Sequence, residues 1–170
     1  FCKFTTSHES FAGLSILASW VNDTHLKCMS PPQALPGRFC VEISNNNIDF
    51  SDDCIQFEYT AAAEIYRIAP KHGLRTGGTN VSITGTNFRS SDNMRCRFGG
   101  LEGVKAVVLS NTSLVCTAPA MAAAGWVPVE VSNNAGVDYT ESGLQFLYVE
   151  LPTLAYVYPD LGPEVGGTLL

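Results

Sequence analysis

Three histidines are the side chains best suited to acid–base chemistry near neutral pH, and none of them lies in a recognisable catalytic motif. His8, His25 and His72 are widely separated in the sequence, whereas a hydrolase needs a nucleophile, a base and an orienting group within hydrogen-bonding reach of one another. His72 directly precedes Gly73, which favours a solvated turn. We therefore expect neither an enzyme nor a bound cofactor.

A cluster of acidic residues near the middle of the first half offers oxygen ligands for a hard cation. Asp49, Asp52 and Asp53 are close in sequence, and Ca²⁺ requires several oxygens close together. The segment lacks the glycine and the bidentate glutamate of a dedicated calcium loop, and the matching place later in the chain offers only Asp138 and Glu141. The sequence therefore favours a solvated acidic hairpin tip without a metal.

Six cysteines without metal-type C-x-x-C spacing indicate disulfides and an oxidising compartment. The alternative is six buried free thiols in a cytosolic protein. Three Asn-x-Ser/Thr sequons agree with the oxidising compartment, and we expect N-linked glycans at Asn22, Asn80 and Asn111. Together these features predict an extracellular or cell-surface protein that travels through the secretory pathway.

The composition restricts the class of partner. The chain has 170 residues, of which 45% are hydrophobic and 15% charged, as in a globular protein. Its net charge of −6 leaves no basic face for phosphate backbones, so nucleic acid is not an expected partner. The sequence has no run of 18 apolar residues, and we expect membrane attachment only through a longer parent chain.

An internal repeat organises the sequence. The segment 69–79 returns at 158–168, with matching residues 89 positions apart in the pairs Pro70 and Pro159, Gly73 and Gly162, and Gly77 and Gly166. Self-similarity at a fixed period indicates a tandem array. We expect positive φ angles at the glycines of these turns, Gly73, Gly77 and Gly78, and a bend or bulge at Gly85.

The repeat also proposes cysteine pairs. Cys2 matches Cys96 and Cys28 matches Cys116, which gives bridges Cys2–Cys28 and Cys96–Cys116. The remaining pair would join the two arms of a hairpin centred at Asn47, with Cys40 opposite Cys54 on its outer face.

The repeated segment resembles the opening of a known module. The pattern Pro-x-x-Gly-x-x-x-Gly-Gly-Thr-x-Val-x-Ile-x-Gly-x-Asn-Phe, from Pro70 to Phe88, is similar to the start of an IPT/TIG domain, the immunoglobulin-like module named from plexins and transcription factors. The resemblance continues through the segments 96–98, 114–119, 127–134 and 146–148. It implies an all-β, immunoglobulin-like sandwich, whereas the function of such modules varies widely.

The expected organisation is one complete repeat flanked by two partial ones. Residues 1–59 would be the later part of repeat one, 60–149 the complete repeat two, and 150–170 the first two strands of repeat three. In the complete repeat we expect strands at the spacing of a sandwich, at 64–68, 80–86, 94–98, 104–110, 113–117, 127–132 and 144–149.

One surface differs between the repeats in a way that suggests contact with another protein. Trp126, Pro128 and Leu147 occupy outward positions that correspond to Arg38, Cys40 and Glu58 in repeat one. Apolar residues gathered on an outer sheet face are typical of an interface. The alternative is a loop that folds over Trp126.

The resemblance implies a non-catalytic role in a long array. Such arrays form stalks of plexin-like and growth-factor-receptor-like ectodomains, of fibrocystin-like proteins, and of large surface or filament proteins. We expect an extracellular structural or adhesion spacer whose partners are neighbouring repeats, further copies or a protein ligand; the alternative is the stalk of a signalling receptor. A self-assembly variant would let segment 150–170 of one copy supply strands that repeat one of another copy lacks.

Overall fold

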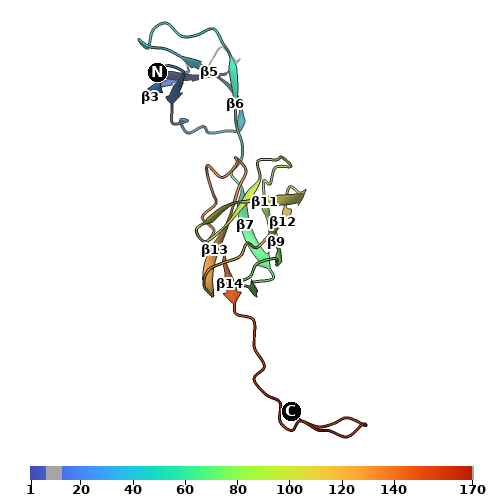
Figure 1. The fold of residues 1–170 in the computed structure, drawn as a ribbon. Helices are drawn as coiled ribbons and strands as arrows, with labels where there is room; N and C mark the ends of the chain where they lie inside the picture. The colour runs from blue at the N-terminus through green and yellow to red at the C-terminus, as the bar shows by residue number, and fades with distance from the viewer. Residues whose placement is uncertain (7–12, 170) are drawn as a thin grey trace. The chain divides into compact units, whose positions relative to one another are not determined.

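The computed structural model describes residues 1–6 and 13–169, which divide into two units, Phe1–Ala62 (unit 1) and Ala63–Leu170 (unit 2). Figure 1 shows that the regular elements of the described residues are β-strands, so the expected all-β fold is confirmed. Across this described part, no helix is long and apolar enough to cross a membrane. His8 lies outside the described residues.

Unit 2 is a two-layered sandwich built on one continuous ladder. The strands follow the order β7-β9-β12-β11-β10-β13-β14-β8. The ten-residue β11 pairs through its first half with β10 and through its second half with β12, so it passes from one layer to the other. The bounds of the strands are β7 (Glu64–Ala69), β8 (His72–Leu74), β9 (Asn80–Thr86), β10 (Arg95–Phe98), β11 (Leu101–Ser110), β12 (Ser113–Thr117), β13 (Gly125–Ser132) and β14 (Gln145–Val149).

Alternating apolar residues fill the space between these layers. Val81 and Ile83 of β9 and Phe98 and Phe146 of the opposite layer are fully buried, because successive side chains of a strand point to opposite faces. The rings of Phe98 and Phe146 pack edge to face with their centroids 5.7 Å apart, a favourable arrangement for aromatic pairs. This core holds the two layers together and leaves the outer faces to solvent.

The described residues of unit 1 form six strands in two separate sheets. One sheet has the order β2-β1-β5-β6, and the other is the two-stranded ribbon β3-β4. The bounds are β1 (Cys2–Thr5), β2 (Leu14–Ile16), β3 (Ser19–Asn22), β4 (His25–Lys27), β5 (Gly37–Ile43) and β6 (Ile55–Tyr59). Leu17 and Ala18 separate β2 from β3.

The two units share the same strand register. In unit 1, Cys2 lies opposite Ile43 and Ile16, just as Cys96 of unit 2 lies opposite Val131 and Val104. The ribbon β3-β4 repeats the register of β11 and β12, including a register shift at the matching step. The β5-β6 pairs likewise coincide with those of β13 and β14.

The glycines act partly as expected. Gly77 and Gly78 have φ of 80° and 86°, whereas Gly73 has no positive φ, so that expectation is wrong. A Cβ atom at Gly73 would lie 2.3 Å from the Thr79 hydroxyl oxygen; close packing, and not backbone chirality, requires glycine there. At Gly85 a Cβ atom would lie 2.0 Å from the Glu64 carbonyl oxygen, and the bulge falls on the partner strand β7.

Two further regions differ from expectation. The short strand β8 pairs parallel with β14 where a turn was expected. Residues 150–169 contain no strand, although two were expected. In unit 2, β7 hydrogen-bonds only to β9 among the described strands, and the position matching the start of β9 is Leu169. Leu154 is 81% exposed where its counterpart Ile65 is 5% exposed.

Candidate functional site

The outer face of β13, β14 and β8 carries an exposed apolar surface. Trp126 lies opposite Leu147, and Leu147 lies opposite His72 on the neighbouring strand. The indole side chain of Trp126 is 59% exposed, Leu147 is half-buried, and Pro128 is exposed. We call Trp126, Pro128 and Leu147 the outer apolar face; the structure brings all three together.

The same positions in unit 1 are polar. Arg38 lies opposite Glu58 and Cys40 opposite Gln56, in the register that places Trp126 opposite Leu147 and Pro128 opposite Gln145. Opposite charges across a strand pair stabilise a solvated sheet face. The two units therefore share their strand pairing and differ in what their outer faces present.

The loop between β13 and β14 covers the other end of this sheet and leaves Trp126 exposed. Glu130 is 3% exposed and accepts hydrogen bonds from the backbone N–H of Ser142 (3.1 Å) and from the hydroxyls of Ser142 (3.2 Å) and Thr140. Tyr139 of the same loop stacks on Arg97, with the guanidinium carbon 4.4 Å from the ring centroid. The alternative of a loop folded over Trp126 is thus wrong.

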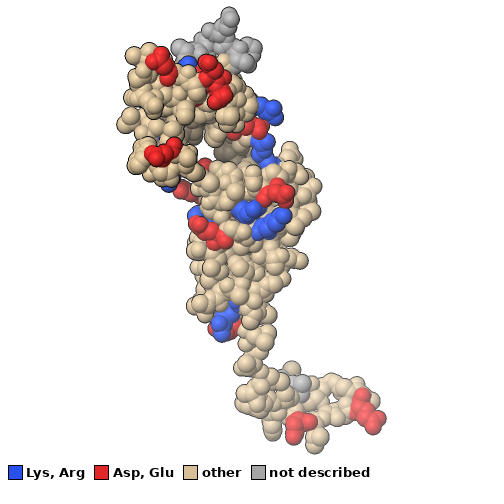
Figure 2. Space-filling view, turned by 45° about the horizontal axis from the view of Figure 1, so that its top comes forward, with Lys and Arg blue, Asp and Glu red and all other residues tan. Residues whose placement is uncertain are grey.

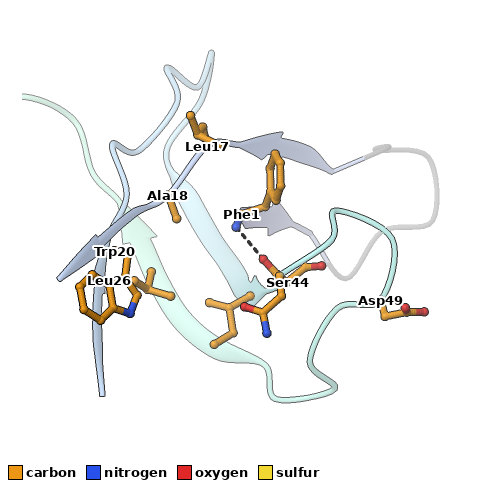
Figure 3. A pocket seen from close by; sticks show the side chains of 9 residues that line it. Phe1, Leu17, Ala18, Trp20, Leu26, Ser44 and Asp49 are labelled. Atoms are coloured by element: carbon orange, nitrogen blue, oxygen red, sulfur yellow. Dashed lines mark hydrogen bonds between the residues drawn. The ribbon is translucent and has the colours of Figure 1, made fainter. Parts of the chain in front are cut away.

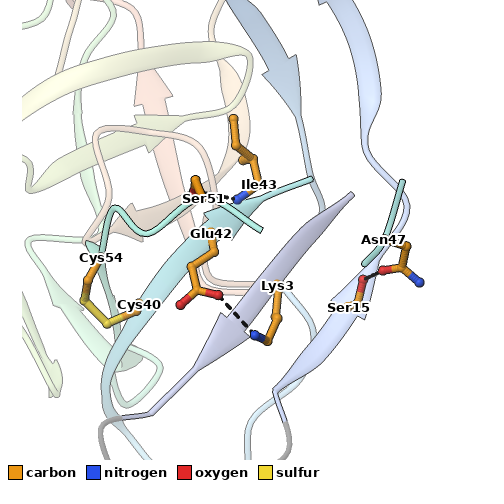
Figure 4. A network of polar contacts seen from close by, with 8 residues as sticks. All are labelled: Lys3, Ser15, Cys40, Glu42, Ile43, Asn47, Ser51 and Cys54. Carbon is orange, nitrogen blue, oxygen red and sulfur yellow. Dashed lines mark hydrogen bonds and ion pairs between the residues drawn. A yellow bond between two sulfur atoms is a disulfide. The ribbon is translucent and has the colours of Figure 1, made fainter. Parts of the chain in front are cut away.

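Sequence reasoning missed this buried carboxylate. Lys3 and Glu42 of unit 1 form an ion pair of 3.1 Å at the equivalent positions (Figure 4), and the Lys3 ammonium lies 4.8 Å from the centroid of the Phe50 ring. A cation, a glutamate and an aromatic ring therefore recur in both units. The recurrence of Glu42 and Glu130 88 positions apart was the signal that could have found them.

Charge is spread thinly over the molecule. On the face of unit 2 seen in Figure 2, a few basic side chains lie beside acidic ones, and large areas carry no charge. Lys105 pairs with Asp92 at 3.0 Å, and this hydrogen bond and the lysine's charge hold the pKa of Asp92 below its usual value. Such an isolated exposed pair contributes little to stability.

The structure joins all three proposed cysteine pairs, with Cα–Cα distances of 6.4 Å for Cys2–Cys28, 6.5 Å for Cys96–Cys116 and 4.6 Å for Cys40–Cys54. The first two connect the layers of their units. The hairpin of the third has a different register from the expected one, because Cys40 lies opposite Gln56. The shift is two residues, so both cysteines stay on the outer face (Figure 4).

The asparagines of the three sequons are exposed and lie at strand ends or in a turn. Asn80 begins β9, and its side-chain oxygen accepts a hydrogen bond from the Thr117 hydroxyl (2.9 Å). Asn111 is in the turn between β11 and β12, and Asn22 ends β3 at the turn to β4. The Thr24 hydroxyl donates to Asn22 at 3.0 Å. No sequon falls on β13, β14 or β8, the strands that form the outer apolar face.

The remaining residues considered for catalysis or metal binding are two histidines and the acidic cluster. His25 contacts Thr24 and Asn22, and His72 lies on β8. Asp49 accepts a hydrogen bond from the Asn46 side chain at 2.7 Å. Within residues 1–6 and 13–169, no group of three His, Cys, Asp or Glu side chains is arranged to hold a metal ion.

A tyrosine closes each unit in the same way. The hydroxyl of Tyr148 donates to the Pro119 carbonyl at 2.9 Å, and that of Tyr59 donates to the Pro31 carbonyl at 2.8 Å. Burial raises the pKa of Tyr148 to about 12 and also raises the pKa of Tyr59, because a buried phenolate would lose its hydration. These bonds fix the chain before β5 and β13 onto the last strand of each unit.

Unit 1 also contains an open apolar cavity of about 350 Å³. Figure 3 shows Trp20 and Leu26 on one side of it and Phe1 and Ser44 on the other. Sequence analysis did not anticipate this cavity, since it depends on which strands cover the ribbon β3-β4. The full lining is Phe1, Leu17, Ala18, Trp20, Leu26, Ile43, Ser44, Asn45 and Asp49.

The sequence is similar to fibrocystin-L of two species. Fibrocystin-L of Mus musculus is 30% identical over 135 residues, which cover 76% of this chain and 3% of that protein. Fibrocystin-L of Homo sapiens is 29% identical over 152 residues, or 88% of this chain and 4% of the relative. The chain thus matches only a small share of these relatives' length.

Among solved structures, the extracellular region of plexin A4 with domains 1 to 10 matches with a TM-score of 0.48 and 24% identity, over 76% of this chain and 11% of that one. A family model described as the IPT/TIG domain matches residues 63–148. This span is half of the sequence and coincides with the sandwich of unit 2. The chain therefore belongs to the IPT/TIG family.

Proposed function

We propose that this chain is an extracellular structural or adhesion module of a tandem IPT array, with unit 1 as the later part of one repeat and unit 2 as a complete repeat. The observation that carries the proposal is the register common to the two units: Cys2 and Cys96, and Tyr59 and Tyr148, make corresponding contacts. Residues 150–170 would begin a third repeat, as the paired glycines Gly166 and Gly167 indicate (φ 76° and 89°).

The outer apolar face is the proposed contact surface of this module. The strands β13 and β14 that carry this face pair in the same register as β5 and β6 of unit 1. Trp126 and Leu147 stand where unit 1 has the charged residues Arg38 and Glu58. An exposed tryptophan in an apolar setting is a typical anchor of a protein interface. The partner would be a protein, either a neighbouring repeat or a separate ligand.

Glycans at Asn22, Asn80 and Asn111 are the second part of the proposal. All three side chains are exposed, and a glycan there would leave the outer apolar face uncovered. The bridges at Cys2–Cys28, Cys40–Cys54 and Cys96–Cys116 fit the oxidising secretory pathway that attaches such glycans.

Labelling of intact native cells tests the location. An antibody raised against this chain should bind unpermeabilised cells or the extracellular matrix, and the recovered protein should lose mass on treatment with a peptide N-glycosidase. Staining that requires permeabilisation, with free thiols on the recovered chain, would contradict the proposal. A receptor stalk, the alternative, would be indicated by a membrane span and a cytoplasmic domain on the same polypeptide.

Strand exchange between copies receives less support. The segment 154–163 matches β7 and β8, but β7 is held in unit 2 by β9 alone among the described strands. A donor segment would therefore also need residues equivalent to β9 in order to pair with the ribbon β3-β4.

A further inference from the structure

A second apolar surface lies on the other layer of unit 2, on the outer side of β11 and β12. Val107 lies directly opposite Val115 in the strand pairing, and Leu109 follows on β11. Val107 and Leu109 are 62% and 65% exposed, and Val115 is half-buried. We call Val107, Leu109 and Val115 the β11-β12 patch. Apolar side chains gathered in this way on a sheet face are typical of a surface that is covered by another group.

The corresponding surface of unit 1 is polar. The register that pairs Val107 with Val115 in unit 2 pairs Ser19 with Lys27 in the ribbon β3-β4. The strand pairing therefore forms equally well with polar side chains at these two positions. The apolar pair of unit 2 is not required by the pairing of β11 with β12, which leaves contact with a covering group as its reason.

Uncharged hydroxyl side chains border the β11-β12 patch on the side of β9. Because side chains alternate along a strand, they lie on the same face as Val115, in the pairs that β12 forms with β9. Apolar side chains beside hydroxyl groups fit a carbohydrate, whose rings have apolar C–H faces and hydroxyl edges that can donate and accept hydrogen bonds. The bordering residues are Ser82, Thr84, Ser113 and Thr117.

An attachment site for a carbohydrate lies on this same face. Asn80 is the first residue of β9 and begins a sequon that ends at Ser82, and its side chain is exposed. Asn80 pairs with Thr117, so Val115 is its diagonal neighbour across the strand pair, at about 7–8 Å. The Thr117 hydroxyl donates to the side-chain oxygen of Asn80 at 2.9 Å. This bond occupies the amide oxygen and leaves the amide nitrogen, the atom that carries an N-linked glycan, for the sugar.

We propose that the N-linked glycan of Asn80 lies back over the sheet and that its first sugars cover Val115 and Val107. The glycan hides one of the two apolar surfaces of unit 2, and the outer apolar face with Trp126 stays open for a protein. The inference rests on the glycan at Asn80 in the proposed function, and it adds where that glycan lies and which side chains it contacts.

NMR of the full chain, secreted by eukaryotic cells and containing isotopically labelled valine, tests the contact after mass spectrometry has measured the occupancy of Asn80. In the occupied chain we expect nuclear Overhauser effects between N-acetylglucosamine protons and the methyl groups of Val107 and Val115. A soluble paramagnetic probe should relax these methyl groups about twofold less than in S82A, because a bulky glycan covers one side of each. The methyl groups of Val137, which is 78% exposed on the loop between β13 and β14, should relax equally in both.

Matched variants separate the glycan from the residues around it. S82A removes the sequon and leaves Asn80 in place, whereas S82T keeps the sequon and should keep the protection. N111Q removes a different glycan and should leave Val107 and Val115 covered. S82A should also lower the unfolding temperature of unit 2. In V107S/V115K, which gives unit 2 the polar pair of unit 1, S82A should no longer do so, because the two changes remove the same contact.

The possible results distinguish this inference from the proposed function. An unoccupied Asn80 would overturn the glycan at that position in the proposed function, and this inference with it. If Asn80 is occupied but S82A leaves the relaxation of Val107 and Val115 unchanged, the glycan extends into solvent and only this inference is wrong. If N111Q exposes the two side chains and S82A does not, the glycan of Asn111 is the cover and the assignment to Asn80 is wrong.

Discussion

The strands of unit 1 pair in the same register as their counterparts in unit 2, but the two units bury their side chains very differently. Phe57 and Phe146 occupy the same place, and both pack edge to face on a tyrosine, at 4.9 and 5.0 Å. Phe57 is nevertheless 39% exposed, whereas Phe146 is fully buried. Hairpins and bridges thus suffice to set the register, while the closed core depends on β7 and β9. Unit 2 should therefore derive its stability from the core and unit 1 from its bridges.

The largest expected contrast comes from truncating the equivalent phenylalanines. F146A should lower the free energy of unfolding of unit 2 by about 3–5 kcal/mol, because it leaves a cavity in a closed core. F57A should cost unit 1 about 1–2 kcal/mol, because much of that side chain already contacts water. Denaturant unfolding followed by NMR signals of each unit measures both values. Equal costs would show that unit 1 also has a closed core.

Removal of a disulfide bridge should disrupt unit 1 more than unit 2, the reverse of the effect of truncating a phenylalanine. C96S/C116S should lower the stability of unit 2 by about 3–4 kcal/mol and leave it folded. C2S/C28S should detach the ribbon β3-β4, since an isolated two-stranded ribbon is marginal in water. Amide exchange in residues 19–28 and 113–117 distinguishes the two outcomes. A ribbon that stays protected in C2S/C28S would contradict the assignment of unit 1 stability to this bridge.

Alkaline pH should destabilise unit 2 through Tyr148. Its pKa is raised to about 12 in the folded state from 10.0, so the folded state retains its proton between these values while the unfolded state loses it. Stability is complete below pH 10 and declines as the pH rises towards 12, by about 2–3 kcal/mol in total. Y148F is the control and should remove this part of the pH dependence. A slope unchanged in Y148F would assign it to other groups.

Removal of the shared tyrosine hydrogen bond should lower the stability of the two units by nearly equal amounts. Y59F and Y148F each remove one hydrogen bond to a proline carbonyl, at 2.8 and 2.9 Å. A neutral hydrogen bond contributes about 0.5–1.5 kcal/mol. Thermal unfolding at pH 7 should show losses within this range for both variants. A much larger loss in one unit would mean that its tyrosine anchors more than this bond.

The smallest effect is expected on the outer faces. W126S and R38S should each change stability by less than about 0.5 kcal/mol, as is usual for exposed positions. Only W126S should weaken adhesion of beads coated with the chain to its native cell surface. If R38S weakens adhesion equally, the contact surface does not reside on unit 2 alone.

Local patterns made part of this architecture predictable. The strands β9 and β12 have the expected bounds, because alternating apolar residues and the glycine turns before β9 define them. The short β8 was missed because three residues that include Gly73 carry no periodic signal, and it forms only by parallel pairing with β14. Residues 150–169 have the sequence of strands but form none in the described part of the chain, because strand formation depends on tertiary pairing that a local pattern does not reveal.

The outer apolar face was also predictable from the sequence. Parity placed Trp126, Pro128 and Leu147 on one face, because side-chain direction along a strand alternates. The two-residue error in the register of the Cys40–Cys54 hairpin preserved parity and hence did not affect the pairing. The cavity depends on tertiary packing and has no local sequence signal, whereas the recurrence of Glu42 at Glu130 could have indicated the buried carboxylate but not its burial.

The edge strands of unit 2, β7 and β8, should limit its aggregation in concentrated solution. β7 is interrupted by a bulge and carries Glu64 and Arg67, and β8 is only three residues long. Bulges, charges and short length all discourage edge-to-edge aggregation. The five-residue edge strand β6 of unit 1 has Glu58 as its single charged residue and exposes Ile55 and Phe57. Recombinant production should therefore yield a soluble unit 2, while any precipitation should begin at β6.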